Sequence, residues 1–467
     1  MTVMRFAACA LIACLVPINA AAQGVTLPAV ERVVLDNGAV IILLEKRDVP
    51  LVGVEAVIRG GAVSDPDGRA GMASLLAGLL EKGAGRRSAA EFAEAVDSVG
   101  GTLSASAGLE SITISAEFLA RDADLMIELL VDMLQSPTLD GAEVLKLRDR
   151  RIDFIRAAKD GDPGRLTSIY GSAFLFGGHP YGRPINGSEE SLANISPADV
   201  RGHYHDYFGA DRLIISIAGD IDASTMLERL ANAFSGWAAA PASLPEFDDP
   251  APVVGRRVLL VDKPGATQSY FWLGNVGVSV NHAPRAELDI ANTLFGGRGR
   301  WTSMLVRELR TKAGLTYRAS SQLRRLSKAG SVAIVSYTKT ETMSEAIDLA
   351  LSLLQKLRDE GFADDMIVSG KNYILGQFAP GFETAEQLAA QFATLESYGL
   401  DESYINDYGN AIASADGETI RSVIKDIYPE LDNLVFTIIG DAELIREQVA
   451  KYGPVTEMQI TDPRFHP

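Results

Sequence analysis

Apolar residues recur every three or four positions in several stretches of the chain, and polar residues fill the positions between them. In an α-helix this spacing places the apolar side chains on one face, so each stretch predicts an amphipathic helix. Each half of the chain therefore supplies helices that can cover a sheet. The expected helices are 70–82, 89–99 and 123–135 in the first half and 286–295, 302–312 and 343–360 in the second.

Runs of apolar and β-branched residues between the helices predict strands. The first such region is divided by Asp36-Asn37-Gly38, a sequence typical of a tight hairpin turn. We expect an α+β fold in each half, with a mostly antiparallel sheet and helices on one of its faces. The strand regions are 31–46, 52–63, 100–118 and 256–275.

Two segments of the chain, 204–222 and 424–443, share one pattern of helix, turn, buried strand and Gly-Asp stop. Aligned on Gly219-Asp220 and Gly440-Asp441, they lie 221 residues apart, about half the length of the chain. An offset of that size indicates two similar halves. The matched pairs are Tyr207 with Tyr428, Leu213 with Leu434 and Ile217 with Ile438.

The segment 238–252, AAAPASLPEFDDPAP, separates the two halves. It is rich in proline, alanine and acidic residues and lacks periodicity, which favours an exposed linker. We therefore expect one domain at 23–237 and a second at 253–467, after a signal peptide at 1–22.

The N-terminus has the pattern of a secretory signal peptide. Arg5 precedes an apolar run at 6–18, and the small residues 20–22 precede Gln23. This pattern predicts export to the periplasm with a mature end near Gln23. An alternative is a lipoprotein signal, because Leu11-Ile12-Ala13-Cys14 is similar to a lipobox, but the apolar run before Cys14 is unusually short.

Both cysteines, Cys9 and Cys14, fall within the proposed signal, so the mature chain has no thiol and forms no disulfide. The formal net charge of −18 argues against a nucleic-acid partner. No later segment is long and apolar enough to span a membrane.

Three further segments carry a family resemblance: 60–85 (GGAVSDPDGRAGMASLLAGLLEKGAG), 179–192 (HPYGRPINGSEESL) and 295–317 (FGGRGRWTSMLVRELRTKAGLTY). Together with the Gly-Asp stops, they resemble the pitrilysin/insulinase clan, peptidase family M16, and in particular its shorter bacterial members. The resemblance runs over essentially the whole mature chain. It implies the M16 metallohydrolase fold, with the two halves forming one half of a clam-shell.

In that family the helix of the first segment carries H-x-x-E-H, which binds zinc and activates a water. Aligned on Lys82-Gly83, the chain has Ser74 and Gly78 in place of the two histidines and Ala77 in place of the glutamate. The register of the third ligand falls at 154–155, with Asp153 as the nearest carboxylate. The resemblance therefore implies no zinc in this chain.

A relocated zinc site is not supported by the histidines. His203 and His205 lie two residues apart on a predicted helix and so point to different faces. His179 precedes a proline in a loop, where a positioning role is expected. The five histidines are His179, His203, His205, His282 and His466.

The segment ELRTKAGLTY keeps the family's arginine and tyrosine as Arg310 and Tyr317. We expect Arg310 in the last turn of a helix closed by Gly314, and Tyr317 on the following strand. The resemblance implies that Tyr317 donates to the substrate carbonyl as it gains negative charge and that Arg310 holds the peptide backbone. The alternative is an ordinary helix-end cation and an ordinary strand aromatic.

Two other motifs carry less weight. Residues 295–300, FGGRGR, lack the G-x-x-x-x-G-K-[ST] pattern of a phosphate loop, so we expect a tight entry to the next helix. In zinc-bearing relatives the counterpart of 100–118 offers a strand edge to substrate. Ser104 stands where many relatives have asparagine, which puts that use in doubt.

The resemblance implies the zinc-free subunit of a two-chain M16 peptidase that degrades exported peptides. Its partner would be a sister chain that bears H-x-x-E-H and the zinc, and neither chain would cleave peptides alone. An alternative is a purely structural or peptide-binding homologue with no role in proteolysis. An autonomous zinc protease is excluded by the missing ligands.

Overall fold

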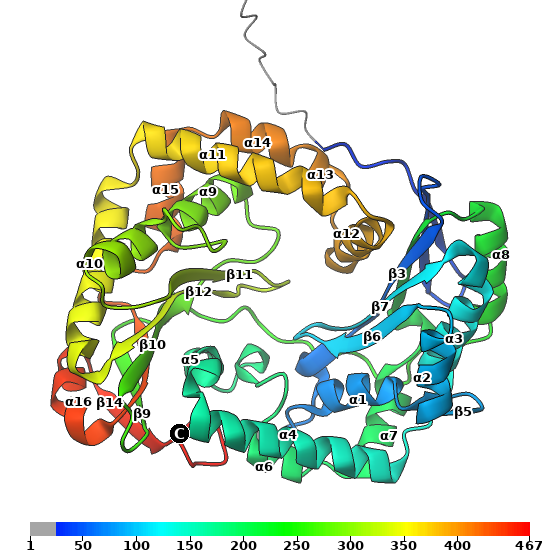
Figure 1. Cartoon of the computed structure of the whole chain (residues 1–467), viewed down its shortest axis with the longest axis horizontal. Coiled ribbons are helices and arrows are strands. Elements are labelled where there is room, and N and C mark those ends of the chain that lie inside the picture. The colour runs from blue at the N-terminus through cyan, green and yellow to red at the C-terminus, as the bar shows by residue number, and fades with distance from the viewer. Residues whose placement is uncertain (1–24) are drawn as a thin grey trace, which may run out of the picture.

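The computed structural model describes residues 25–467, so the proposed signal peptide at 1–22, Gln23, Cys9 and Cys14 lie outside the described residues. Two six-stranded sheets, one from each half of the chain, lie at opposite ends of the molecule (Figure 1). Helices cover both sheets, so the α+β architecture is confirmed.

The first sheet contains the strands β1 (Glu31–Val34), β2 (Val40–Glu45), β3 (Leu51–Arg59), β6 (Thr102–Ala107), β7 (Ser111–Leu119) and β8 (Leu213–Gly219). Their order is β1-β2-β8-β3-β7-β6. Neighbours run antiparallel except for β2 and β8, which are parallel. The central strand β8 is buried along its full length, as expected for a strand covered on both faces.

The second sheet contains the strands β9 (Arg257–Asp262), β10 (Gln268–Val276), β11 (Ala319–Arg324), β12 (Ser331–Lys339), β13 (Val435–Gly440) and β14 (Val455–Gln459). Their order, β14-β9-β13-β10-β12-β11, repeats the first sheet from its second strand onward. The outermost strands differ, because β1 comes from the start of the chain and β14 from its end. The two Gly-Asp stops follow β8 and β13 at equivalent places in the two sheets.

The helices of the first half are α1 (Met72–Leu80), α2 (Ala89–Asp97), α3 (Ala123–Gln135), α4 (Gly141–Gly161), α5 (Thr167–Phe176), α6 (Glu189–Ala193), α7 (Pro197–Tyr207) and α8 (Ala223–Phe234). Those of the second half are α9 (Arg285–Phe295), α10 (Met343–Glu360), α11 (Asp364–Phe378), α12 (Ala385–Tyr398), α13 (Ser403–Asn406), α14 (Tyr408–Ser414), α15 (Gly417–Ile427) and α16 (Ala442–Val449). The bounds of α3 and α10 are those predicted from the apolar spacing.

Each half covers the second face of the other half's sheet with one helix. Helix α12 packs on β3 and β8 of the first sheet, and α5 packs on β10 and β13 of the second. The expectation of helices on one face was incomplete, because this second layer comes from far away in the sequence. Leu388, Phe392 and Leu395 of α12 are buried against the first sheet, and each contributes roughly 1.5–3 kcal/mol by burial.

Both exchanged contacts depend on a glycine. A Cβ atom added at Gly53 in β3 would lie 2.5 Å from the backbone nitrogen of Glu386 in α12. A Cβ atom added at Gly171 in α5 would lie 2.6 Å from the indole ring of Trp272 in β10. The glycines therefore permit a helix and a strand of different halves to approach closely.

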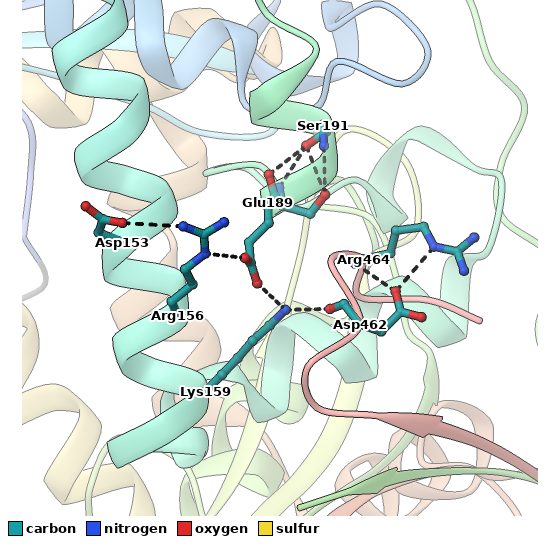
Figure 2. A network of polar contacts seen from close by, with 8 residues as sticks. Asp153, Arg156, Lys159, Glu189, Ser191, Asp462 and Arg464 are labelled. Carbon is teal, nitrogen blue, oxygen red and sulfur yellow. Dashed lines mark hydrogen bonds and ion pairs between the residues drawn. The ribbon is translucent and has the colours of Figure 1, made fainter.

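The C-terminal segment also ties the halves together. Ile460 and Phe465 are buried in the core of the first half, where the Phe465 ring meets the Tyr170 ring edge to face at 4.9 Å. The Lys159 ammonium on α4 donates to the Glu189 carboxylate at 2.7 Å and to the backbone carbonyl of Asp462 at 2.5 Å (Figure 2). The end of the chain thus belongs to the packing of the first half.

The segment 238–252 forms no helix or strand but is held against the first half. The backbone nitrogen of Ala240 donates to the Asp211 carboxylate at 2.7 Å, and the Phe247 ring lies 5.5 Å from the Tyr181 ring. The division into domains at 23–237 and 253–467 stays a prediction. Among the helices of residues 25–467, none has the length and apolar character needed to cross a membrane.

Candidate functional site

The helix α1 carries the positions that correspond to the family's zinc motif. Hydrogen bonds to neighbouring side chains occupy the polar groups at this place. The hydroxyl of Ser74 donates to the side-chain oxygen of Asn186 at 2.7 Å. The guanidinium of Arg151, from α4, donates to the Ser74 hydroxyl at 2.8 Å and to its backbone carbonyl at 2.7 Å. The polar groups of Ser74 are therefore engaged inside the protein.

The Arg151 guanidinium is largely buried beside α1. Burial, together with the neighbouring charge of Arg150, lowers its pKa to about 10. A Cβ atom added at Gly78 would lie 3.0 Å from Leu147 Cδ2 and 3.2 Å from Arg151 Nη2. A histidine at position 78 would thus need the guanidinium to move.

These residues do not fit a zinc ion. Zinc is bound by thiolate, imidazole or carboxylate groups, whereas Ser74, Ala77 and Gly78 supply none of these and Arg151 brings positive charge. Asp153 is three-quarters exposed and pairs with Arg156 on its own helix at 3.7 Å (Figure 2). Within residues 25–467, no group of three or more His, Cys, Asp or Glu side chains could hold a metal ion.

The histidines of the first half have separate, non-metal surroundings. His179 accepts a hydrogen bond from the backbone nitrogen of Tyr181 and lies 3.0 Å from the carbonyl of Asp248, so it positions its loop against the linker. His203 is buried on α7, and burial lowers its pKa to about 4. His205 is exposed beside Asp206, which confirms that the two face different sides of the helix.

The edge of the first sheet is partly occupied. The outward backbone nitrogen of Ala105, on the edge strand β6, donates to the carboxylate of Glu81 at 2.7 Å. Glu81 directly follows α1. A peptide added to β6 as a new strand would compete with this side chain, which increases the doubt raised by Ser104.

In the second half, Arg310 and Tyr317 lie together. The Arg310 guanidinium carbon is 4.4 Å from the centre of the Tyr317 ring and 4.3 Å from the centre of the Trp301 ring. Both rings are about two-thirds exposed, Tyr317 at 70% and Trp301 at 67%. The guanidinium thus lies between two aromatic faces, a favourable arrangement for a cation.

Local structure explains how the pair is brought together. Arg310 lies in a π-helix, Val306–Lys312, rather than in the regular helix expected at 302–312. Gly314 has a φ of 66°, and its backbone nitrogen donates to the Arg310 carbonyl at 3.1 Å, which ends the helix. Tyr317 lies in the turn before β11, which begins at Ala319, so its placement on a strand was wrong.

The polar groups of this pair are available to a ligand. Within residues 25–467 the Arg310 guanidinium makes no hydrogen bond or ion pair, and its central carbon lies over the two rings. A guanidinium held in one plane can donate to a carbonyl or carboxylate with little loss of side-chain entropy. The arrangement can therefore bind a polar backbone and present a phenol beside it.

Two residues of these regions were not identified from the sequence. Arg151 lies on the same helical face as Val144, Leu147 and Ile155, so a charge on an apolar stripe was the available signal. Trp301 follows the glycine-rich segment, and its only signal was a large aromatic residue in an expected loop.

The comparisons with known proteins agree with this description. Residues 40–174 match the family described as insulinase (peptidase family M16), and residues 194–372 match the peptidase M16 inactive domain. These observations define a class of protein: an M16 fold of two similar halves, in which the zinc-motif positions of the first half carry no metal ligands. The chain belongs to peptidase family M16.

Some sequence relatives are named as zinc proteases and another is named as a non-peptidase homolog. A Bacillus subtilis protein named uncharacterized zinc protease YmxG is 24% identical over 86% of this chain and 96% of its own length. A Helicobacter pylori protein named non-peptidase homolog YmxG is 22% identical over 86% of this chain and 91% of its own. The second name fits a non-catalytic member of the family.

Solved structures show the same fold. The crystal structure of a peptidase M16 inactive domain from Pseudomonas fluorescens superposes with a TM-score of 0.82 at 20% identity, over 88% of this chain and 98% of that one. The structure of a protease from Helicobacter pylori gives 0.81 at 20% identity, over 88% of this chain and all of the other.

Proposed function

We propose that this chain is the zinc-free subunit of a heterodimeric M16 peptidase that degrades exported peptides. Its partner is an M16 sister chain that carries H-x-x-E-H and zinc. The observation that carries the proposal is the contrast between two sites. Arg151 donates hydrogen bonds to Ser74 beside α1, whereas the Arg310 guanidinium lies over two exposed rings and has no hydrogen-bond or ion-pair partner among residues 25–467.

The residues of this chain act on the peptide in two ways. The Tyr317 hydroxyl donates to the carbonyl oxygen of the cleaved bond as negative charge develops there, so it acts mainly in the transition state. The Arg310 guanidinium donates to backbone carbonyls of the peptide before and during the reaction. The rings of Trp301 and Tyr317, over which the guanidinium lies, restrict its movement. The partner's H-x-x-E-H residues would hold the zinc, which would supply an activated water.

Reconstitution with a purified H-x-x-E-H sister chain tests this function. Neither chain alone should cleave an unstructured reporter peptide, and an equimolar mixture should cleave it and elute as a heterodimer. A mixture no more active than the sister chain alone would leave the structural or peptide-binding homologue as the better description.

The location is proposed from the N-terminal pattern. Export to the periplasm requires signal cleavage near Gln23, and N-terminal sequencing of the protein from a membrane-free extract should find that end. A lipid-modified Cys14 in the membrane fraction would replace this proposal by a membrane-anchored subunit.

A further inference from the structure

A cavity of about 610 Å³ lies where the two halves meet, between α5 and β11. It is distinct from the exposed stack of Trp301, Arg310 and Tyr317, none of which lines it. Its volume is in the range of sites that bind small ligands or short segments of peptide.

The cavity is basic although the protein is strongly acidic. Of the described residues that line it, four are arginines and one, Asp289, is a carboxylate. The formal net charge of the chain is −18, so this lining is opposite in sign to the protein as a whole. A basic cavity between low-dielectric walls concentrates anions. The four arginines are Arg183, Arg298, Arg324 and Arg325.

Asp289 does not neutralise this positive charge. It lies within 4.0 Å of the guanidinium groups of Arg285, Arg298 and Arg325, and also accepts a hydrogen bond from the Tyr408 hydroxyl at 2.7 Å. One carboxylate therefore faces three cations. The buried Nη1 atom of Arg325 has no hydrogen-bond partner among the described residues, 25–467.

Arg324 has donors that the described residues do not use. Within residues 25–467 its guanidinium makes no hydrogen bond or ion pair, and burial lowers its pKa although nearby Glu110 opposes this effect. Glu110 is itself engaged, because its carboxylate accepts from the Tyr181 hydroxyl at 2.6 Å and from the backbone nitrogen of Ser327 at 3.1 Å. Arg324 is partly buried, and an anion from a ligand would offset the cost of removing its charge from water.

Arg298 is held in an unusual backbone conformation at the mouth of the cavity. Its φ is 55°, one of two positive values among the described residues other than glycine. Such a conformation is strained for an arginine and is found mainly where the surrounding structure imposes it, often at binding sites. Its side chain is 45% exposed and lies 3.9 Å from Asp289, so it can turn to a ligand.

We propose that this cavity binds a carboxylate group of a peptide through Arg298, Arg324 and Arg325, so that the chain selects acidic peptides. The proposal rests on the proposed function only in taking the ligand to be a peptide. Carboxylates match the fork of N–H donors on a guanidinium, and such charge-assisted pairs are strong where water is excluded.

Binding to the isolated chain tests the proposal without the partner. Fluorescence anisotropy would compare a labelled peptide of alanine and glutamate with its glutamine counterpart. Hydrogen bonds to charged groups predict roughly tenfold or tighter binding of the acidic peptide, and weaker binding as salt rises. Both peptides are amidated at the C-terminus, so a terminal carboxylate contributes to neither and any preference reports the side-chain carboxylates.

The double variant Arg298→Gln/Arg324→Gln should lose the preference for the acidic peptide and keep the affinity for the neutral one. Arg121→Gln removes a comparable charge from the exposed surface and should change neither. A folded double variant that retained the preference would overturn the proposal. Equal affinities of the wild-type chain for both peptides would overturn it as well, even if the double variant does not fold. Failure of the reconstituted peptidase alone would count only against the proposed function.

Discussion

Two regions of the molecule have polar side chains where the family places its chemistry, and they differ in what those side chains contact. Beside α1, the hydroxyl and carbonyl of Ser74 are bonded to Asn186 and Arg151 in the interior. In the second half, the Arg310 guanidinium lies over the rings of Trp301 and Tyr317 and makes no hydrogen bond or ion pair within residues 25–467. The polar groups of the first region are hydrogen-bonded in the interior, whereas the aromatic rings of the second region are exposed to solvent.

This difference shows how a site can lose its chemistry without leaving a defect. Removing metal ligands from a buried helix would leave polar groups unpaired, which costs stability. Here the Arg151 guanidinium fills the space beside Gly78 and pairs with Ser74, so the helix keeps its place. The Arg310 guanidinium has no comparable hydrogen-bond partner within the described part of the chain, residues 25–467.

The largest expected effect concerns the exposed pair. In the reconstituted peptidase, Tyr317→Phe should lower kcat about 10²–10³-fold, or roughly 3–4 kcal/mol, because one donor to the developing oxyanion is lost. The KM should change little. Tyr207→Phe, which removes a hydroxyl from α7 in the first half, is the control and should leave turnover unchanged. A raised KM with unchanged kcat would instead assign Tyr317 to substrate binding alone.

A matched pair of arginine variants tests the comparison directly. Arg151→Ala should lower the free energy of unfolding by about 3 kcal/mol, because two charge-assisted hydrogen bonds to Ser74 are lost in the interior. Arg310→Ala should lower the free energy of unfolding by no more than about 1 kcal/mol, the value of an exposed cation–π contact. The same variant should weaken peptide binding by the reconstituted heterodimer. Urea denaturation would measure stability and KM would measure peptide binding. The comparison of the two regions would be contradicted if Arg310→Ala mainly lowered stability and Arg151→Ala mainly weakened peptide binding.

The packing around α1 should also make stability depend on pH. Burial lowers the pKa of His203 to about 4, so between about pH 4 and 6.5 the unfolded chain binds a proton that the folded chain excludes. Stability from this group is fully present above pH 6.5 and falls by at most about 3 kcal/mol as the pH is lowered towards 4. His203→Gln should flatten the decrease in urea titrations, and His205→Gln should not. Equal slopes for wild type and His203→Gln would show that His203 is not kept neutral.

Restoring the motif should not restore the metal. The triple variant Ser74→His/Ala77→Glu/Gly78→His should bind no stoichiometric zinc while Arg151 remains, and overpacking beside Leu147 should cost about 1–3 kcal/mol. Elemental analysis and thermal unfolding check both statements. One tightly bound zinc in the triple variant would show that the guanidinium does not close the site.

Much of the fold followed from local pattern. The helices α3 and α10 and the turn at Asp36-Asn37-Gly38 were predicted because their signals depend on neighbouring residues alone. The covering of each sheet by a helix of the other half was not predicted. The contacts of α5 and α12 join residues roughly a hundred or more positions apart, and hydrophobic periodicity does not identify the partner of a face.

The site was predicted in part, for similar reasons. The motif located Arg310 and Tyr317 but not the backbone between them. The Thr316 hydroxyl accepts from the backbone nitrogen of Arg318 at 3.1 Å and donates to its carbonyl at 2.9 Å. This local turn competes with a strand, so Tyr317 precedes β11. The pairing of Arg151 with Ser74 joins two helices and had no local signal except a charge on an apolar stripe.

The central claim is that Arg310 and Tyr317 of this chain act on a peptide that is cleaved at the zinc site of a partner chain. The most direct test is kcat/KM of the reconstituted peptidase with Arg310→Ala and Tyr317→Phe combined, in a variant that still forms the heterodimer. We expect kcat/KM to fall at least about 10³-fold, because ground-state binding and oxyanion stabilisation are both removed. Full activity of that heterodimer would contradict the account and leave this chain a structural subunit.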